Sequence, residues 1–250
     1  MKRIFSIVLT FILFGILFFC GFGFVARAQA FQSGDKFIVC IDAGHQIKGD
    51  LKTEPVAPGS SERKARVSAG ATGIGTKKPE YEVNLEAAMV LKDILLEKGY
   101  EVVMTRDSNN ATISNVERAQ LANNANANIT IRLHCDYIDN AGKTGTVILV
   151  PSQNGHHTKE IYGSSKDYAD ILKSKLKSNG IVVNGIFERA DITGFNWSKV
   201  PVIILEMGFM SNYNDDQMLS NPDYQKNLMN IVAESLDEYK NRTETNRSPS

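Results

Sequence analysis

The sequence predicts a single α/β domain with a mostly parallel, twisted sheet of about six strands and helices on both faces. Short apolar runs typical of buried strands alternate with longer helical segments, and no internal repeat or second domain is visible. The length of 250 residues is near the upper limit for one compact domain. Hydrophobic residues at 42% and charged residues at 22% are usual for a globular protein, which argues against a disordered chain.

The first 30 residues have the pattern of an export signal. Lys2 and Arg3 precede an uncharged stretch, residues 4–25, that is long enough to span a membrane. The A-x-A pattern of residues 28–30 is typical of a signal-peptide cleavage site. We therefore predict that residues 1–30 are a signal peptide or, if uncleaved, an N-terminal membrane anchor. In both cases the domain is exported and contacts the membrane only through this segment.

The charge balance argues against nucleic acid as a partner. The chain has 28 basic and 28 acidic residues, and Lys2, Arg3 and Arg27 fall within the export segment. The remaining domain is therefore slightly acidic, whereas nucleic-acid-binding domains are usually basic.

The cysteine pattern excludes a small disulfide-stapled protein, because the chain has only three cysteines. Cys40 and Cys135 lie outside the export segment, in apolar runs typical of strands. We expect two buried thiols, and a disulfide between them is the open alternative.

The first part of the domain combines a strand, a long loop and a helix. Residues 37–41 form a short apolar run of strand type. Residues 46–79 are rich in Gly, Ser, Pro and charge, with seven basic and three acidic residues, so we expect a functional lid rather than a disordered loop. Pro79 begins a helix of about 20 residues that ends at Lys98 and Gly99. Its apolar face is expected to carry Tyr81, Leu85, Met89 and Leu95.

The remaining chain alternates strands and helices. Further strands are predicted at residues 101–105, 128–133, 146–150, from 181 onward, and 201–205. Further helices are predicted after the capping box of residues 114–117, at residues 166–177, and from Pro222 to about 239. The predicted domain thus covers residues 31–240, and residues 241–250 are a polar tail expected to fray.

Three predicted strands end in a group that can bind metal or transfer a proton, namely His45, His134 and Glu206. In open α/β sheets, ligands bind beyond the carboxyl ends of parallel strands. Glu80 lies at a helix N-terminus, where a carboxylate is favoured. Two histidines and a glutamate are a common ligand set for catalytic zinc, and Glu206 would then be free to move protons. The alternative, that these are ordinary turn and helix-start residues, is equally open at this point.

Several neighbouring residues allow two interpretations. Asp42 and Asp136 flank the two histidines, and they either orient the imidazole rings or simply form turns. His156 and His157 are adjacent, so their side chains point apart, and we expect a solvated loop rather than a metal site. Trp197 could stack on a sugar ring, although packing at the rim of the core is the more usual role for a single tryptophan.

Five sequence blocks occur in an order typical of one enzyme family. They are I-D-A-G-H at residues 41–45, E-Y-E-V-N-L at 80–85, V-M-T-R-D at 103–107, I-R-L-H-C-D at 131–136, and P-V-I-I-L-E-M-G-F-M-S-N at 201–212. Over about residues 36–240, the sequence resembles the zinc-dependent N-acetylmuramoyl-L-alanine amidase family (amidase type 3) of bacterial cell-wall hydrolases. Gln46 and Arg132 depart from the residues common in that family.

The resemblance implies a function and a set of site residues. It implies one Zn²⁺ per domain bound by His45, Glu80 and His134, with Glu206 as the catalytic carboxylate. It also implies a peptidoglycan substrate, cut at the amide between N-acetylmuramic acid and L-alanine. Weaker candidates for substrate binding are Asn84, Arg106, Asp136, Arg189 and Trp197.

Two other functions and one other role for Glu206 stay open. Another zinc peptidoglycan peptidase, either a carboxypeptidase or an endopeptidase, would use the same metal chemistry on a different bond. A non-catalytic wall-binding module would normally lack one of the four site residues, and this chain has all four. Glu206 could also serve as a structural salt-bridge partner, for example of Arg189.

Overall fold

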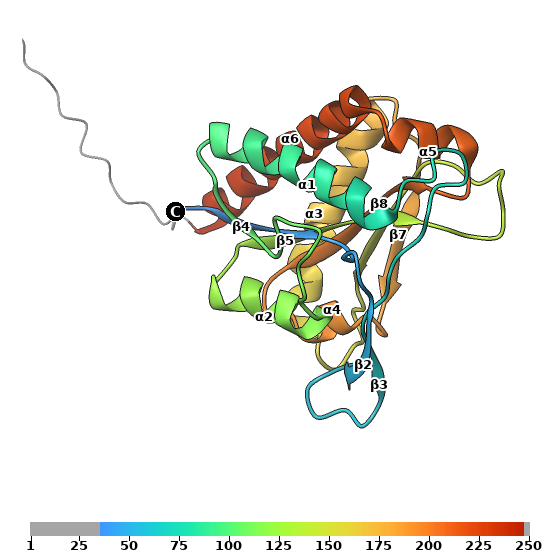
Figure 1. The fold of residues 1–250 in the computed structure, drawn as a ribbon. Helices are drawn as coiled ribbons and strands as arrows, with labels where there is room; N and C mark the ends of the chain where they lie inside the picture. Colours follow the sequence, from blue (N-terminus) through green and yellow to red (C-terminus); the bar gives the residue numbers. More distant parts are fainter. Residues whose placement is uncertain (1–35, 248–250) are drawn as a thin grey trace, which may run out of the picture. The chain divides into compact units, whose positions relative to one another are not determined.

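The computed structural model describes residues 36–247. These residues form a six-stranded sheet with helices on both faces, which confirms the predicted α/β fold (Figure 1). The predicted export segment, residues 1–30, lies outside the described residues. Within residues 36–247, no helix is both long enough and apolar enough to cross a membrane.

The strand order of the sheet decides which strand ends meet. The order is β4 (Glu101–Met104), β1 (Ile38–Ala43), β5 (Ile129–Asp136), β8 (Val202–Phe209), β6 (Thr146–Pro151) and β7 (Val183–Arg189). Neighbours from β4 to β8 are parallel, and β6 is antiparallel to β8 and parallel to β7. The carboxyl ends of β1, β5 and β8 therefore lie side by side at one end of the sheet, as predicted.

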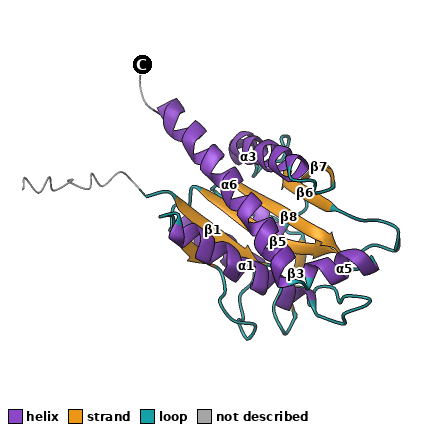
Figure 2. Ribbon diagram, turned by 90° about the horizontal axis from the view of Figure 1, so that it is seen from above, coloured by secondary structure: helices purple, strands orange, loops and turns teal. Residues whose placement is uncertain are grey.

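Helices cover the two faces of the sheet unequally. One face carries three long helices, α1 (Glu80–Glu97), α3 (Lys159–Ser178) and α6 (Pro222–Arg247) (Figure 2). The other face carries α2 (Asn115–Asn124) and the short α4 (Thr193–Asn196). The main hydrophobic core therefore lies under the three long helices.

Side chains of β8 alternate between these two faces, as strand geometry requires. Ile203 and Leu205 pack in the main core, whereas Ile204 packs with Phe195 of α4. The same alternation places Glu206 on the face of Ile204, two residues farther along the strand.

Helix ends are set by local signals. α1 begins after Pro79, and Gly99 follows its end with a φ of +82°, a conformation that favours glycine. α2 begins with the predicted capping box, in which Ser114 and Glu117 each bond to the other's backbone N–H. Both helix starts are therefore confirmed.

The prediction of the apolar face of α1 is wrong, because a different side of the helix faces the core. Of the four residues expected on it, only Leu95 is fully buried, and the buried apolar stripe is instead Val83, Ala87, Ala88, Leu91 and Leu95. The small alanines allow α1 to approach β1 and α6 closely. The larger side chains at the predicted positions, such as Tyr81, lie on the flanks of the contact and are half-buried.

Other boundaries differ from those predicted from the sequence. α3 begins at Lys159, seven residues earlier than expected, and α6 continues through residues 241–247 instead of ending near 239. The short helices α4 and α5 (Tyr213–Leu219) were not predicted, because segments this short have too little periodicity to be recognised.

The segment 46–79 is ordered around a β-hairpin. β2 (Asp50–Pro55) and β3 (Arg63–Val67) pair in antiparallel fashion. Arg66 of β3 forms one ion pair with Asp50 of β2, within the hairpin, and another with Glu117 of α2. The second ion pair joins the hairpin to α2. Lys64 also pairs with an acidic residue, Asp191, so acidic neighbours balance part of the hairpin's positive charge.

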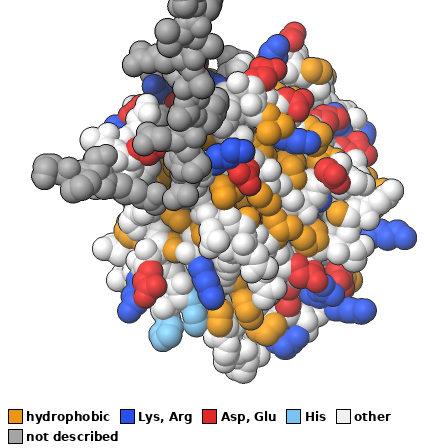
Figure 3. Space-filling view, turned by 90° about the vertical axis from the view of Figure 1, so that its left-hand side faces the viewer, with side chains coloured by type: hydrophobic (Ala, Val, Ile, Leu, Met, Phe, Trp, Pro, Cys, Tyr) orange, Lys and Arg blue, Asp and Glu red, His pale blue; other side chains and the backbone are white. Residues whose placement is uncertain are grey.

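The β4 edge of the sheet is short and partly apolar. Figure 3 views the molecule from the left-hand side of Figure 1, where β4 lies, and shows hydrophobic side chains gathered in a band across this face. Val102 and Met104 of β4 are half-buried against the main core. A strand of four residues offers few free backbone groups, which limits edge-to-edge association.

Cys40 and Cys135 are buried free thiols. Cys40 packs with Ala122 and Ala127 on the α2 side of the sheet, and Cys135 belongs to the main core on the opposite side. The expectation of two buried thiols is therefore confirmed.

Candidate active site

Two histidines and a glutamate converge at the carboxyl edge of the sheet. His45 Nε2 lies 3.1 Å from Glu80 Oε1, and His134 Nδ1 lies 3.2 Å from the same oxygen. The two ring nitrogens, His45 Nε2 and His134 Nδ1, are 3.2 Å apart. The three donor atoms thus form a nearly equilateral triangle, so the structure brings these sequence-predicted residues together.

The backbone around the triangle has little room. His45 follows β1 with a φ of +60°, which turns the chain sharply at the end of the strand. A Cβ added to Gly44 would lie 2.3 Å from the imidazole ring of His134. A Cβ added to Gly70 would lie 2.9 Å from Glu80 Oε2. Glycines at 44 and 70 therefore allow the donor groups to approach one another.

The ring of His45 is oriented by the segment that follows the hairpin. His45 Nδ1 lies 2.9 Å from the carbonyl oxygen of Ser68 and 3.1 Å from Ser68 Oγ. A carbonyl only accepts hydrogen bonds, so Nδ1 carries the proton and donates it. Nε2 is then the unprotonated nitrogen, and its lone pair is available to a cation in the triangle.

The carboxylate of Glu80 is held on both oxygens. Its Oε2 accepts a hydrogen bond of 2.8 Å from the backbone N–H of Ala71. Its Oε1 accepts bonds from the backbone N–H of Cys135 at 3.1 Å and from Asn84 Nδ2 at 3.2 Å. Burial raises the pKa of Glu80, but its interactions with the imidazole rings of His134 and His45 in the metal-free site outweigh burial and hold that pKa well below its usual value.

The triangle fits a zinc ion. Zinc bonds of about 2.0–2.1 Å to nitrogen and oxygen in tetrahedral geometry place two donor atoms about 3.3 Å apart. The observed separations of 3.1 to 3.2 Å agree with that value. Burial also lowers the pKa of His134 to about 4, so this ring is neutral at neutral pH and can act as a ligand. The donor set of two imidazoles and one carboxylate matches zinc chemistry.

Glu206 lies beside the triangle. It is the register partner of His134 across the parallel β5–β8 pair, and its Oε2 atom is buried without a hydrogen-bond partner among the described residues. Burial, followed by the negative charges of Glu80 and Asp136, raises the pKa of Glu206 well above its usual value. An unpaired, partly exposed carboxylate with a raised pKa has the properties of a proton-transfer group.

The alternative role of Glu206 as a salt-bridge partner is wrong. Arg189 forms its ion pair with Asp191, at 2.8 Å and 2.9 Å. Within residues 36–247, no ion pair joins Arg189 to Glu206. Arg189 affects Glu206 only through its charge, which favours the ionised carboxylate.

Comparison with known proteins identifies the family. A family model described as N-acetylmuramoyl-L-alanine amidase matches residues 39–238, a range that includes all four site side chains. The chain belongs to the N-acetylmuramoyl-L-alanine amidase family. The match confirms the resemblance derived from the five sequence blocks.

Individual relatives of this amidase are distant. An N-acetylmuramoyl-L-alanine amidase of Mycobacterium tuberculosis is 25% identical over 207 residues, which cover 80% of this chain and 84% of the relative. The germination-specific N-acetylmuramoyl-L-alanine amidase of Bacillus subtilis is 24% identical over 186 residues, which cover 66% of this chain and 73% of the relative. The crystal structure of an N-acetylmuramyl-L-alanine amidase from Mycobacterium smegmatis is similar with a TM-score of 0.74 at 22% identity, covering 81% of this chain and 96% of that chain. At that identity, the structural likeness establishes the fold.

Asp42 does not orient either histidine of the amidase site. Its carboxylate accepts hydrogen bonds from Arg118 and Arg132, each at 2.6 Å, and from Thr105. All four side chains are buried. Asp42 is therefore the anion of a buried ionic cluster beneath the active-site loop. The alternative that it orients an imidazole ring is wrong.

Two predicted substrate-binding residues instead support the site from inside. Asn84 is fully buried, and its Nδ2 donates to Glu80 Oε1 and to the carbonyl oxygen of Gly44. Arg106 is also buried and donates to the carbonyl oxygens of residues 43, 44 and 81. Because their donors are used within the protein, both side chains position the loop and the glutamate rather than face a substrate.

The other predicted contact residues lie at the surface. Asp136 accepts a hydrogen bond from the next backbone N–H, which is a turn contact, and it lies close enough to Glu206 to affect its pKa. Arg189 is exposed. Substrate contact at Asp136 and Arg189 stays a prediction. Trp197 lies away from the triangle, where its Nε1 donates to the carbonyl oxygen of Pro55 in the hairpin.

His156 and His157 lie in the loop before α3, as predicted. Their rings contact each other, with centroids 4.7 Å apart, so the expectation that these adjacent side chains point apart is wrong. Within residues 36–247, the His45–Glu80–His134 triangle is the only cluster of metal-ligating side chains, so neither of these histidines belongs to one.

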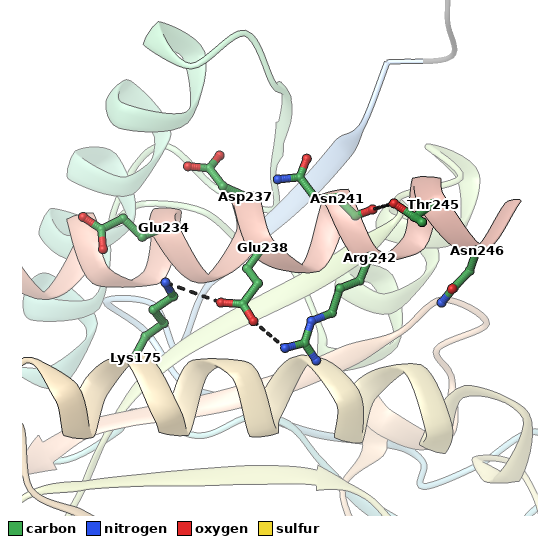
Figure 4. Close-up of a pocket in the computed structure, with 8 residues that line it drawn as sticks. All are labelled: Lys175, Glu234, Asp237, Glu238, Asn241, Arg242, Thr245 and Asn246. Atoms are coloured by element: carbon green, nitrogen blue, oxygen red, sulfur yellow. Dashed lines mark hydrogen bonds and ion pairs between the residues drawn. The ribbon is translucent and has the colours of Figure 1, made fainter. Parts of the chain in front are cut away.

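A groove between α3 and α6 is separate from the active site (Figure 4). Its volume is about 800 Å³. Lys175 Nζ lies 3.4 Å from Glu238 Oε2, and Arg242 pairs with the same carboxylate. Two basic and three acidic side chains line the groove, and none of the four site residues does, so this groove is a charged, partly ion-paired surface between helices.

Three backbone groups that support the site cannot be recognised in the sequence. The carbonyl oxygen of Ser68 and the N–H groups of Ala71 and Cys135 fix the ligand side chains. Backbone groups leave no residue-type signal, and two of these three lie in a segment whose path depends on the hairpin. Gly70, with a φ of +83° beside Glu80, is the one signal in that segment that could have been read.

We expect Gly44→Ala to weaken metal binding. The φ of residue 44 is not in the left-handed region, so only the contact of the new Cβ with His134 opposes the change. Displacing that ring should lower Zn²⁺ affinity by roughly 10- to 100-fold, as is usual when support for a metal ligand is lost. Isothermal titration calorimetry of the apoprotein measures this affinity.

Gly163→Ala is the matched control for that variant. Gly163 lies within α3 and has open space around its Cα, so alanine should preserve the fold and the Zn²⁺ affinity. Equal affinities for the two variants would contradict the close contact between Gly44 and His134.

Proposed function

We propose that this protein is a zinc-dependent N-acetylmuramoyl-L-alanine amidase. It hydrolyses the amide bond between the lactyl group of N-acetylmuramic acid and the L-alanine of the stem peptide in peptidoglycan. The observation that carries the proposal is the triangle of His45, Glu80 and His134 donor atoms with the unpaired carboxylate of Glu206 beside it. Membership of the amidase family supports the same conclusion.

One zinc ion per domain would be held by His45 Nε2, Glu80 Oε1 and His134 Nδ1. When bound, zinc supplies a Lewis acid that polarises the scissile carbonyl and makes the attacking water more acidic. The backbone contacts to Glu80 and the contact of His45 with Ser68 keep the ligand atoms oriented before the metal arrives.

Glu206 moves the protons that the reaction requires. It takes a proton from the attacking water and delivers it to the nitrogen of the departing alanine. An alkyl amine cannot leave as an anion near neutral pH, so a proton donor is necessary. The buried Oε2 atom, which has no competing partner among the described residues, is the oxygen available for this transfer.

The substrate agrees with the expected location of the domain. Peptidoglycan lies outside the cytoplasmic membrane, and residues 1–30 carry the sequence pattern of an export signal. We therefore propose an exported protein, either secreted into the wall or anchored to the outer face of the membrane through that segment.

The decisive experiment is digestion of purified peptidoglycan with the domain, followed by mass spectrometry of the products. An amidase frees the amine of L-alanine and leaves whole stem peptides separated from the glycan. A carboxypeptidase would release single amino acids, and an endopeptidase would cut within the stems. A non-catalytic wall-binding module would release nothing.

The metal ligands are tested by removing each histidine. We expect His45→Ala and His134→Ala each to lose most of the roughly one zinc ion per domain that the purified protein holds. Zinc is counted by inductively coupled plasma mass spectrometry after gel filtration. His156→Ala removes an exposed histidine outside the triangle and should keep its zinc. Full zinc content in both ligand variants would contradict the assignment.

A further inference from the structure

A second cavity lies on the α2 and α4 side of the sheet, away from the metal-binding triangle. Its volume is about 500 Å³, within the range of cavities that bind small organic ligands. Four separate segments build it: the hairpin tip at Pro58, the C-terminal half of α2, the loop at His157, and the stretch 196–199 that includes Trp197.

The walls of this cavity are polar and nearly uncharged. Gln120 and Asn124 of α2 are exposed, and their amide groups have no hydrogen-bond partner in the part of the chain that the structure describes. Trp197 is half-buried, and the bond from its Nε1 to Pro55 fixes the indole ring. Free amides beside a fixed aromatic ring suit a ligand that has hydroxyl or acetamido groups on an apolar face, which is the chemistry of a sugar.

Lys199 adds one positive charge to these walls. It is exposed and forms no ion pair with any residue of 36–247, and no Asp, Glu or Arg lines the cavity. A polyanion would need more positive charge, and an apolar ligand would need fewer amides. The walls therefore suit a mostly neutral sugar with an occasional carboxylate.

We propose that this cavity binds peptidoglycan glycan strands from which the stem peptides have been removed. The inference rests on the proposed function, because hydrolysis of the lactyl–alanine amide leaves a free lactyl carboxylate on each N-acetylmuramic acid. Trp197 stacks on a sugar ring, Gln120 and Asn124 bond to its acetamido or hydroxyl groups, and Lys199 pairs with the freed carboxylate.

The position of the cavity fits a polymer that contacts the enzyme twice. α2 begins beside the hairpin, where Asn115 bonds to Arg66 and Arg132, and it ends at Asn124 in the cavity wall. Its ten residues span about 15 Å. A glycan strand from which the enzyme has removed the stem peptides can thus stay bound in the cavity while the active site hydrolyses another stem of the same peptidoglycan. This binding raises the effective substrate concentration.

The experiment uses the fluorescence of the single tryptophan of the chain. Because Trp197 is the only one, a change in its emission reports on this cavity. The full-length exported protein is titrated with peptide-free oligomers of N-acetylglucosamine and N-acetylmuramic acid, with chitotetraose, and with maltotetraose. We expect saturable changes with the first two, tighter binding of the first because of its carboxylates, and no saturation with maltotetraose.

Variants at exposed side chains separate binding from folding. Gln120→Ala should weaken both N-acetylated ligands by about three- to tenfold, the effect of losing one hydrogen bond. Lys199→Gln should weaken only the muramic acid oligomers. Gln217→Ala removes an exposed helical glutamine outside the cavity and is the matched control, expected to bind all ligands as the wild type does.

The outcome is independent of catalysis, since peptide-free strands contain no scissile amide. Absence of saturable binding of the muramic acid oligomers, or equal affinities for Gln120→Ala and Gln217→Ala, would overturn the proposed site. Binding by a protein that releases no stem peptides would instead keep the sugar site and refute the proposed amidase function. Saturation with maltotetraose at similar affinity would overturn the specificity for N-acetylated sugars.

Discussion

Glu206→Gln should abolish most amidase activity while preserving the zinc. The substitution keeps the shape of the side chain and removes its ability to accept and deliver a proton. General acid–base groups typically contribute about 10²- to 10⁴-fold to the rate, and we expect kcat to fall within that range. The rate is measured as stem peptide released from purified peptidoglycan, and the zinc content is measured on the same sample.

Glu101→Gln is the control for that experiment. Glu101 is exposed at the first residue of β4, so its loss should change neither rate nor zinc content. A zinc-loaded, folded Glu206→Gln protein that releases stem peptides at nearly the wild-type rate would refute the proton-transfer role of Glu206.

The same variant should also stabilise the metal-free protein at neutral pH. The pKa of Glu206 is raised in the folded state by burial and by Glu80 and Asp136, so the folded protein binds a proton more tightly than the unfolded chain does. The stability of the folded protein therefore falls as the pH rises from the pKa of Glu206 in the unfolded chain, about 4.3, toward its raised pKa in the folded protein. Glutamine removes this loss. We expect a higher Tm for the metal-free variant than for the metal-free wild type at pH 7, and no gain at pH 4.

The four central site residues could be predicted because their positions follow from topology. Parallel strands meet at their carboxyl ends, so polar groups following β1, within β5 and within β8 had to come close once these strands were neighbours. His134 and Glu206 are in fact paired in register. Glu80 was found because a carboxylate at a helix N-terminus is a local signal.

The sequence of the hairpin lacks the pattern from which strands are predicted. β2 and β3 carry mostly polar, charged side chains and bury little of their own surface, so they lack the apolar alternation that marks a half-buried strand. Their stability comes from contacts distant in sequence, such as Arg66 with Glu117. The same dependence on distant contacts hid the orientation of His45 by Ser68.

The size of a side chain does not predict the buried face of α1. Large apolar residues such as Tyr81 and Met89 suggested the inward face, but the close packing of α1 requires alanines there. Polar side chains such as Asn84 and Arg106 are likewise candidates for substrate contact in the sequence, although in the structure they donate to buried carbonyl and carboxylate oxygens. The sequence shows which residue types are present, but their partners depend on the tertiary structure.

Asp42→Asn should cost more stability than any other single charge removal discussed above. Asp42 is the carboxylate bound by Arg118 and Arg132, and all three side chains are buried. Without that charge, the two guanidinium groups have no compensating anion, and a third buried arginine, Arg106, lies near enough to add repulsion. Breaking a buried ion pair from one side costs about 3–5 kcal/mol. For a domain of this size we expect a fall in Tm of about 10 °C or more.

Asp191→Asn is the matched control, because Asp191 also pairs with two cations, Arg189 and Lys64, but at the exposed surface. Exposed ion pairs contribute about 1 kcal/mol or less, so the Tm of Asp191→Asn should change little.

The pH dependence of stability gives a second test of the Asp42 cluster. The arginines hold the pKa of Asp42 well below its usual range. The ionised carboxylate therefore stabilises the fold fully above pH 3.9, which is about the pKa of Asp in the unfolded chain, and this stabilisation is lost as the pH falls further. The wild type should therefore lose stability in acid more steeply than Asp42→Asn. Equal Tm losses for the two variants, with parallel acid profiles, would show that the buried cluster does not depend on this carboxylate.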